Sequence, residues 1–174
     1  MQRVGVEERA GDVAPWLEVP GHADAGAVRP GGRMLLAYDS LTGNVRRLAL
    51  DLAATLGAPL LDVRHPDSAA PGQPYLLLTY TFGRGQMPDS TRVFLEQHAP
   101  LLRGVVASGS YHWGQHFARA ADVIAAAYGV PVVAKVDKGG SAADRQRVLS
   151  WIGAQRHGPH DVHAGGMTWN AGSN

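Results

Sequence analysis

The stretch that decides the fold is YDSLTGNVRR, residues 38–47, which follows the apolar run MLLA and leads into a helical pattern. It places two hydroxyl residues, a glycine and an amide in the turn between a strand and a helix. Gly43 has no side chain, so its backbone can approach a ligand closely, and the first N–H groups of a helix have no partner within that helix. The segment therefore predicts a turn that binds an anion.

Outward from this turn, apolar runs of strand length alternate with helical patterns. The run PYLLLTYT is aliphatic through its middle, which is typical of a parallel strand covered on both faces. The alternation predicts an α/β fold, a three-layer doubly wound parallel sheet of five strands in the order 2-1-3-4-5. The strands are expected at residues 34–39, 59–63, 74–81, 104–108 and 131–136.

Helical spacing of apolar residues fills the gaps between these strands. Asp89 or Ser90 should cap the second helix. The side chains of that helix expected to face the sheet are Val93, Phe94 and Leu101. The helices are expected at residues 44–57, 89–102 and 116–129, and from residue 141 or 142 to residue 152.

The composition of the chain excludes several classes of function. The chain has 174 residues, 45% hydrophobic and 18% charged, which is an ordinary balance for one globular domain. A net charge of +1 gives no electrostatic case for nucleic acid, and no apolar run is long enough to span a membrane. The absence of cysteine excludes thiolate nucleophiles and cysteine-ligated metals, so redox chemistry would need a bound cofactor. We expect a cytoplasmic protein without a metal site.

The two ends of the chain differ in composition from its middle. Residues 1–33 are rich in glycine and proline with few large apolar groups, and are expected to be a flexible N-terminal extension. An alternative is that translation begins at Met34. The domain is expected at residues 34–153, followed by a flexible Gly/His-rich tail at residues 154–174.

The ligand crevice of such a sheet lies beyond the carboxyl ends of its strands, where the strand order reverses. Three polar loops meet there, at residues 39–44, 79–88 and 108–116. In the first, hydroxyl and amide groups and helix-start N–H groups are suited to a phosphate, although Thr42 or Asn44 could merely cap the helix. In the third, Trp113 could stack on a ligand or simply cover the edge of the sheet.

Together the motifs YDSLTGNV, LLTYTFGRGQMP and RGVVASGSYHWGQHFARAAD resemble the NrdI family, flavodoxin-like FMN proteins that partner class Ib ribonucleotide reductase. The resemblance covers about residues 34–152. It implies a flavodoxin-like fold and non-covalently bound FMN, which carries the chemistry without a catalytic side chain. The implied phosphate residues are Ser40, Thr42, Gly43, Asn44 and Val45. The implied ring residues are Thr79, Tyr80, Thr81, Gly83, Gly85, Ser108, Gly109, Trp113 and Gly114.

The resemblance also implies a role. Reduced FMN would react with O2 and supply superoxide or a related oxidant to the small subunit of the reductase, to assemble its dimanganese-tyrosyl radical cofactor. The chain would then be an activating partner that also needs a reductase or other electron donor. It departs from the family at Ser110, where asparagine is common, and at Arg84, where an apolar or small residue is more usual.

The charges of the loops favour this role over plain electron transfer. Residues 79–88 and 108–117 contain no Asp or Glu and offer Arg84, His112 and His116 instead. Carboxylates near the ring disfavour the anionic reduced flavin. Because these two loops have none, the reduced flavin should be less destabilised here than in an electron carrier. Two alternatives stay open: a short electron-transfer flavodoxin, and a flavodoxin-like binding module without flavin.

Overall fold

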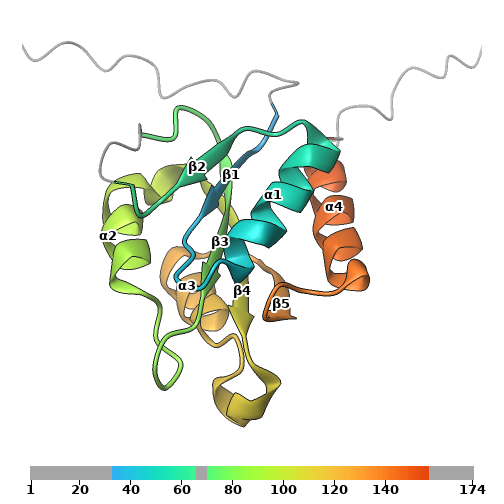
Figure 1. The fold of residues 1–174 in the computed structure, drawn as a ribbon. Coiled ribbons are helices and arrows are strands. Elements are labelled where there is room, and N and C mark those ends of the chain that lie inside the picture. The colour runs from blue at the N-terminus through green and yellow to red at the C-terminus, as the bar shows by residue number, and fades with distance from the viewer. Residues whose placement is uncertain (1–32, 66–69, 157–174) are drawn as a thin grey trace, which may run out of the picture.

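The computed structural model describes residues 33–65 and 70–156. Within them the chain forms one sheet of five parallel strands in the order β2-β1-β3-β4-β5 (Figure 1). The predicted architecture and strand order are therefore confirmed. The strands are β1 (Leu35–Tyr38), β2 (Leu60–Asp62), β3 (Tyr75–Tyr80), β4 (Leu102–Gly109) and β5 (Val132–Asp137).

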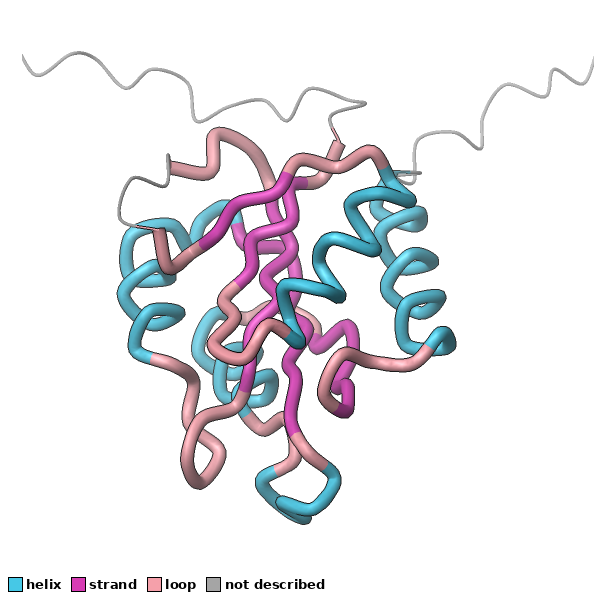
Figure 2. The backbone as a smooth tube through the Cα atoms, viewed as in Figure 1, coloured by secondary structure: helices cyan, strands magenta, loops and turns pink. Residues whose placement is uncertain are grey.

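Helices cover both faces of the sheet, which gives three layers (Figure 2). Side chains alternate between the faces along each strand, so Leu76 and Leu78 pack beneath one pair of helices while Tyr75 and Leu77 pack beneath the other. The first pair is α1 (Asn44–Leu56) with α4 (Ala142–Arg156), and the second is α2 (Asp89–His98) with α3 (Ala120–Tyr128). Strand β3 lies between β1 and β4 and is buried almost throughout, as its aliphatic sequence predicted.

The second helix differs from its prediction. It ends at His98 because Pro100 follows, and residues 99–101 form a short 3₁₀ turn, η1 (Ala99–Leu101). Its N-cap is Pro88, without a side-chain cap, so the expectation that Asp89 or Ser90 caps it is wrong. Val93 is 46% exposed and does not face the sheet, whereas Phe94 is buried as expected.

Two further boundaries differ. Helix α3 begins at Ala120 instead of residue 116, because Gly114 and Ala118 have positive φ and interrupt the helical run. The residues before it form a separate 3₁₀ segment, η2 (Tyr111–His116). Helix α4 continues to Arg156, three residues beyond the expected domain boundary at residue 153. The rest of the predicted tail, and the predicted extension up to residue 32, lie outside the described residues.

No helix in the described part of the chain is long and apolar enough to cross a membrane.

Candidate functional site

A cleft of about 380 Å³ lies at the carboxyl ends of the strands, beside the point where the strand order reverses. This volume falls within the usual range of small-molecule sites, about 300–1,000 Å³. The loops after β3 and β4 project from this end of the sheet (Figure 1). The cleft is lined by Ser40, Leu41, Thr42, Asn44, Val45, Tyr80, Thr81, Phe82, Gly83, Ser108, Gly109, Ser110, Trp113 and Lys138.

The first loop leaves the start of α1 without a side-chain cap. Gly43 is the N-cap residue at φ +86°, a left-handed conformation that suits glycine, and its N–H donates to Ser40 Oγ at 3.1 Å. The first helical bond runs from the Arg47 N–H to the Gly43 carbonyl, so the N–H groups of residues 44–46 precede it. Thr42 and Asn44 do not cap the helix, which removes the capping alternative.

The side chains of this loop are linked to one another. Asn44 donates its amide Nδ2 to Thr42 Oγ1 at 3.3 Å and accepts from Arg47 Nη2 at 3.3 Å. A Cβ added at Gly43 would meet nothing within 4 Å, so the space beside this backbone is open. Open space, hydroxyl groups and N–H groups at a helix start together form an anion-binding arrangement.

The second loop is a tight turn that needs its glycines. The Phe82 N–H donates to the Gln86 carbonyl at 2.8 Å, and the Gln86 N–H returns a bond of 2.9 Å to the Phe82 carbonyl. Gly83 and Gly85 both have positive φ, and a Cβ at Gly85 would lie 2.7 Å from Cδ of Arg119. Phe82 is 57% exposed, so the turn presents an aromatic ring at the rim of the cleft.

The third loop is fixed to its neighbours by hydrogen bonds to the residue that follows β5. Ser108 Oγ donates to the Lys138 carbonyl at 2.6 Å, and the Lys138 N–H donates to the Gly109 carbonyl at 2.8 Å. A Cβ at Gly109 would stand 2.5 Å from the Ala118 nitrogen, so only glycine fits this approach of two backbones. Trp113, in η2, lines the cleft and is 45% exposed.

The structure brings most of the predicted site residues together in the cleft, with four exceptions. Thr79 is buried within β3, where its hydroxyl lies 2.8 Å from Thr91 Oγ1 of α2. Gly43, Gly85 and Gly114 shape the backbone of the loops without lining the cleft. Predicted residues that do line it are Ser40, Thr42, Asn44, Val45, Tyr80, Thr81, Gly83, Ser108, Gly109 and Trp113.

Sequence reasoning missed four lining residues. Leu41, Phe82 and Ser110 belong to the three predicted loops, so loop membership could have included them. Lys138 lies in the loop after β5, which is not among the three loops predicted to form the crevice, although β5 ends at the same edge of the sheet. It is also the one charged side chain among the lining residues. Of the two departures from the family, Ser110 lines the cleft and Arg84 does not.

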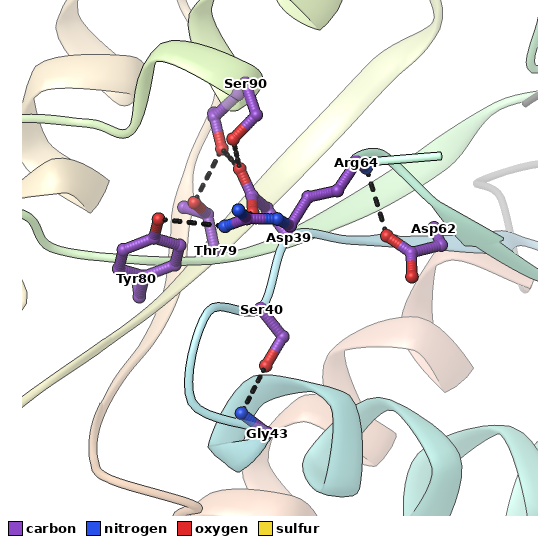
Figure 3. Close-up of polar contacts among 9 residues, drawn as sticks. Asp39, Ser40, Gly43, Asp62, Arg64, Thr79, Tyr80 and Ser90 are labelled. Carbon is purple, nitrogen blue, oxygen red and sulfur yellow. Dashed lines mark hydrogen bonds and ion pairs between the residues drawn. The ribbon is translucent and has the colours of Figure 1, made fainter. Parts of the chain in front are cut away.

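Two carboxyl groups lie behind the cleft, one at the end of β5 and one directly after β1. Asp137 Oδ1 accepts the Tyr111 N–H at 3.1 Å. Asp39 is fully buried at the end of β1, where Oδ2 accepts from Ser90 Oγ at 2.5 Å and Thr91 Oγ1 at 2.8 Å (Figure 3). The second and third loops, which contain no Asp or Glu, are thus backed by acidic residues from other parts of the chain.

Asp39 also acts electrostatically on the wall of the cleft. Burial raises the pKa of Tyr80 above its ordinary value, and the Asp39 carboxylate raises it further. The Arg64 guanidinium lowers that pKa in part, and donates from Nη1 to Tyr80 Oη at 3.3 Å. No group of three or more potential metal-ligating His, Asp or Glu side chains occurs within residues 33–65 and 70–156.

A doubly wound parallel sheet with an uncapped helix start and aromatic side chains in one cleft at its switch point defines a flavodoxin-like α/β protein. Residues 36–150 match the family model described as NrdI flavodoxin-like, and the chain belongs to that family.

Curated relatives agree with this assignment, and a solved structure shares the fold. A protein named Protein NrdI from Deinococcus radiodurans is 58% identical over 141 residues, which cover 79% of this chain and 98% of the relative. One of the same name from Macrococcus caseolyticus is 39% identical over 111 residues, or 64% of this chain and 82% of the relative. The structure of Fusobacterium nucleatum flavodoxin bound to flavin mononucleotide matches with a TM-score of 0.53 at 14% identity, covering 71% of this chain and 96% of that one. This last likeness concerns the fold alone.

Proposed function

We propose that this protein binds FMN in the cleft and, when the flavin is reduced, converts O2 to superoxide or a related oxidant for the small subunit of a class Ib ribonucleotide reductase. The oxidant would assemble the dimanganese-tyrosyl radical cofactor of that subunit, and a reductase or other electron donor would reduce the flavin. Membership of the NrdI flavodoxin-like family and the fold shared with an FMN-bound flavodoxin support this assignment.

The observation that carries the proposal is the uncapped start of α1 beside the cleft. The residues there fit an FMN phosphate, because the N–H groups of Asn44 and Val45 stand at the positive end of the helix dipole. The hydroxyl of Thr42 can complete the cradle, and Gly43 leaves the approach open. Together these groups would bind and orient the phosphate end of the flavin.

Aromatic side chains support the placement of the ring. Tyr80, Phe82 and Trp113 line the cleft from the loops after β3 and β4. Planar side chains of this kind favour a flat ligand through stacking and edge contacts. Thr81 Oγ1 accepts the Ala120 N–H at 3.2 Å, and this buried bond would keep the second loop in place around the ring.

The chemistry that bound FMN supplies is the transfer of an electron to O2, which yields superoxide. The chain contributes electrostatics: Lys138 is the charged residue of the lining, and a cation favours an anionic ligand. Leu41, Phe82, Tyr111 and Trp113 are exposed large apolar side chains on the loops that surround the cleft. Such a rim supports docking of the reductase small subunit at this edge.

The experiment that tests the proposal has two stages. Purified protein is first mixed with FMN, and binding is followed through the visible spectrum and the quenching of flavin fluorescence. The FMN-loaded protein is then reduced with dithionite without oxygen, freed of excess dithionite, and exposed to O2 with a superoxide trap. The proposal predicts bound FMN, fast reoxidation and trapped superoxide.

The other outcomes separate the alternatives. Bound FMN with slow reoxidation and little superoxide would contradict oxidant supply and favour a short electron-transfer flavodoxin. Absence of FMN binding in a folded protein would contradict the cofactor assignment and favour a binding module without flavin. Free reduced FMN at the same concentration is the matched control for reoxidation in solution.

A further inference from the structure

Strand order brings three side chains together behind the cleft. Because β1 lies between β2 and β3, the residues that follow these strands are neighbours at one edge of the sheet. Asp39 follows β1, Arg64 follows β2 and Tyr80 ends β3. The Arg64 N–H donates to Asp62 Oδ1 at 3.0 Å, which turns the chain so that the guanidinium reaches across the end of β1 (Figure 3).

Asp39 is an anion buried against the start of α2. Its Oδ2 accepts the hydroxyls of Ser90 and Thr91, the second and third residues of that helix, and this is the positive end of the helix dipole. Its Oδ1 is buried and accepts no hydrogen bond among the described residues. Arg64 Nη1 lies 3.6 Å from that oxygen and forms the ion pair that balances the carboxylate.

Tyr80 joins this pair to the cleft. The same Arg64 nitrogen that faces Asp39 donates to Tyr80 Oη at 3.3 Å, while the tyrosine itself lines the cleft. Arg64 is partly exposed, with 39% of its side chain accessible, whereas Asp39 is completely buried. A buried charge acts through a low dielectric and is screened less than a surface charge. The ion pair of Asp39 with Arg64 therefore changes the electrostatic potential at the wall of the cleft.

We propose that Arg64 is a positioning residue of the flavin site: it orients Tyr80 against the cleft and balances the charge of Asp39, so that the trio sets the reduction potential of the bound flavin. The inference rests on the proposed function in taking FMN as the occupant of the cleft. Arg64 touches neither the cleft nor the reacting atoms, and acts through Tyr80 and Asp39. The two charges of the trio oppose each other at the same wall.

Opposite charges predict opposite effects, and this separates electrostatic from structural roles. Arg64→Met removes the cation and keeps a long side chain, so it leaves Asp39 unbalanced and lowers the FMN potential. Asp39→Asn removes the anion and leaves the cation, so it raises the potential. A merely structural role would lower stability in both variants without moving the potential in opposite directions. Arg64→Lys keeps the charge and should restore a potential close to that of the unsubstituted protein.

The test measures two quantities in each folded variant. The first is the pKa of Tyr80 in the flavin-free protein, followed by NMR of tyrosine labelled at Cζ and assigned with Tyr80→Phe. The Asp39 carboxylate and the Arg64 guanidinium are the charged groups that act on this phenol, so Arg64→Met should raise its pKa and Asp39→Asn should lower it. The second is the midpoint potential of bound FMN at neutral pH.

Arg103→Met is the matched control. Arg103 is the second residue of β4 and lies at the opposite end of the sheet. Its described hydrogen bonds go only to the backbone carbonyls of Pro100 and Leu102. Opposite shifts of both quantities, beyond those of this control, would support the inference. Shifts of the same sign, or none, would overturn it, as would Arg64→Lys behaving like Arg64→Met. If Asp39→Asn does not fold, the pair Arg64→Met and Arg64→Lys decides the outcome.

Failure of the proposed function would look different. A protein that binds no FMN would refute the cofactor assignment, and the inference about the flavin would fall with it, while the Tyr80 titration would still report whether Arg64 and Asp39 act on that wall. Bound FMN whose potential stays fixed while the Tyr80 pKa moves would overturn the inference alone.

Discussion

Replacement of Gly43 by Asp or by Asn tests the anion site with one charge as the variable. Asn and Asp have nearly the same shape, and both tolerate the left-handed conformation better than other side chains do. Gly43 has φ +86°, and an added Cβ would meet nothing within 4 Å, so strain is the same in both variants and amounts to about 1 kcal/mol. The sheet should fold in both.

The magnitude follows from the charge. Two unit charges about 4 Å apart repel by about 4 kcal/mol at an effective dielectric constant of about 20. Because about 1.4 kcal/mol corresponds to a factor of ten in Kd, Gly43→Asp should bind FMN roughly two to three orders of magnitude more weakly than Gly43→Asn, solvent exposure accounting for the lower figure. Asp is also a favourable N-cap residue, so Gly43→Asp should be no less stable than Gly43→Asn.

The assay is fluorescence titration of FMN into both variants and the unsubstituted protein at low and high salt, with urea unfolding as the stability control. Screening should shrink the difference between the variants as ionic strength rises, since the Debye length falls from about 10 Å at 0.1 M to about 3 Å at 1 M salt. Equal FMN affinity of the two folded variants would refute the phosphate site at the start of α1.

Three further predictions concern single positions. Trp113→Ala should weaken FMN binding about 2- to 12-fold, the value of a lost aromatic contact of about 0.5–1.5 kcal/mol; unchanged titration would return Trp113 to a covering role. Gly109→Ala should lower the free energy of unfolding by about 1–3 kcal/mol, because the new Cβ would stand 2.5 Å from the Ala118 nitrogen; an unchanged urea midpoint would contradict this contact. The Tyr75 hydroxyl donates to the His98 carbonyl at 3.1 Å, and burial raises the pKa of Tyr75. The protonated hydroxyl therefore contributes fully to the free energy of unfolding below the unfolded pKa of about 10, and this contribution falls as the pH rises above that value. Tyr75→Phe should cost about 1 kcal/mol at neutral pH and flatten the alkaline loss seen in urea midpoints; an equally steep loss would assign it to other groups.

The fold could be predicted because its signals are local. An apolar run in the sequence predicts each strand. Gly57 and Gly129 end their helices in the left-handed conformation that glycine favours. Helix boundaries were less predictable where backbone conformation decides them. Ala118, at φ +47°, has a conformation that its residue type does not predict, and it delays the start of α3.

The site could be predicted in outline because its loops follow strands that end at one edge. What sequence could not give are contacts between residues far apart in the chain. Lys138 lines the cleft from the loop after β5, and it has a positive φ that its residue type does not predict. Arg64 contacts Asp39 only because β2 and β1 are neighbours in the sheet. Thr79 shows the converse, since it belongs to a predicted loop but lies within β3, with its side chain buried against Thr91 of α2.

We propose that the reduced, FMN-loaded protein activates a dimanganese small subunit. The most direct measurement is the yield of tyrosyl radical, by electron paramagnetic resonance, in a manganese-loaded class Ib small subunit mixed with this protein and O2. We expect radical formation with the reduced FMN-loaded protein, and none with free reduced FMN or with the Gly43→Asp variant under conditions where that variant holds no flavin. Absence of radical with the loaded protein, in a small subunit that another activating flavoprotein does convert, would contradict it.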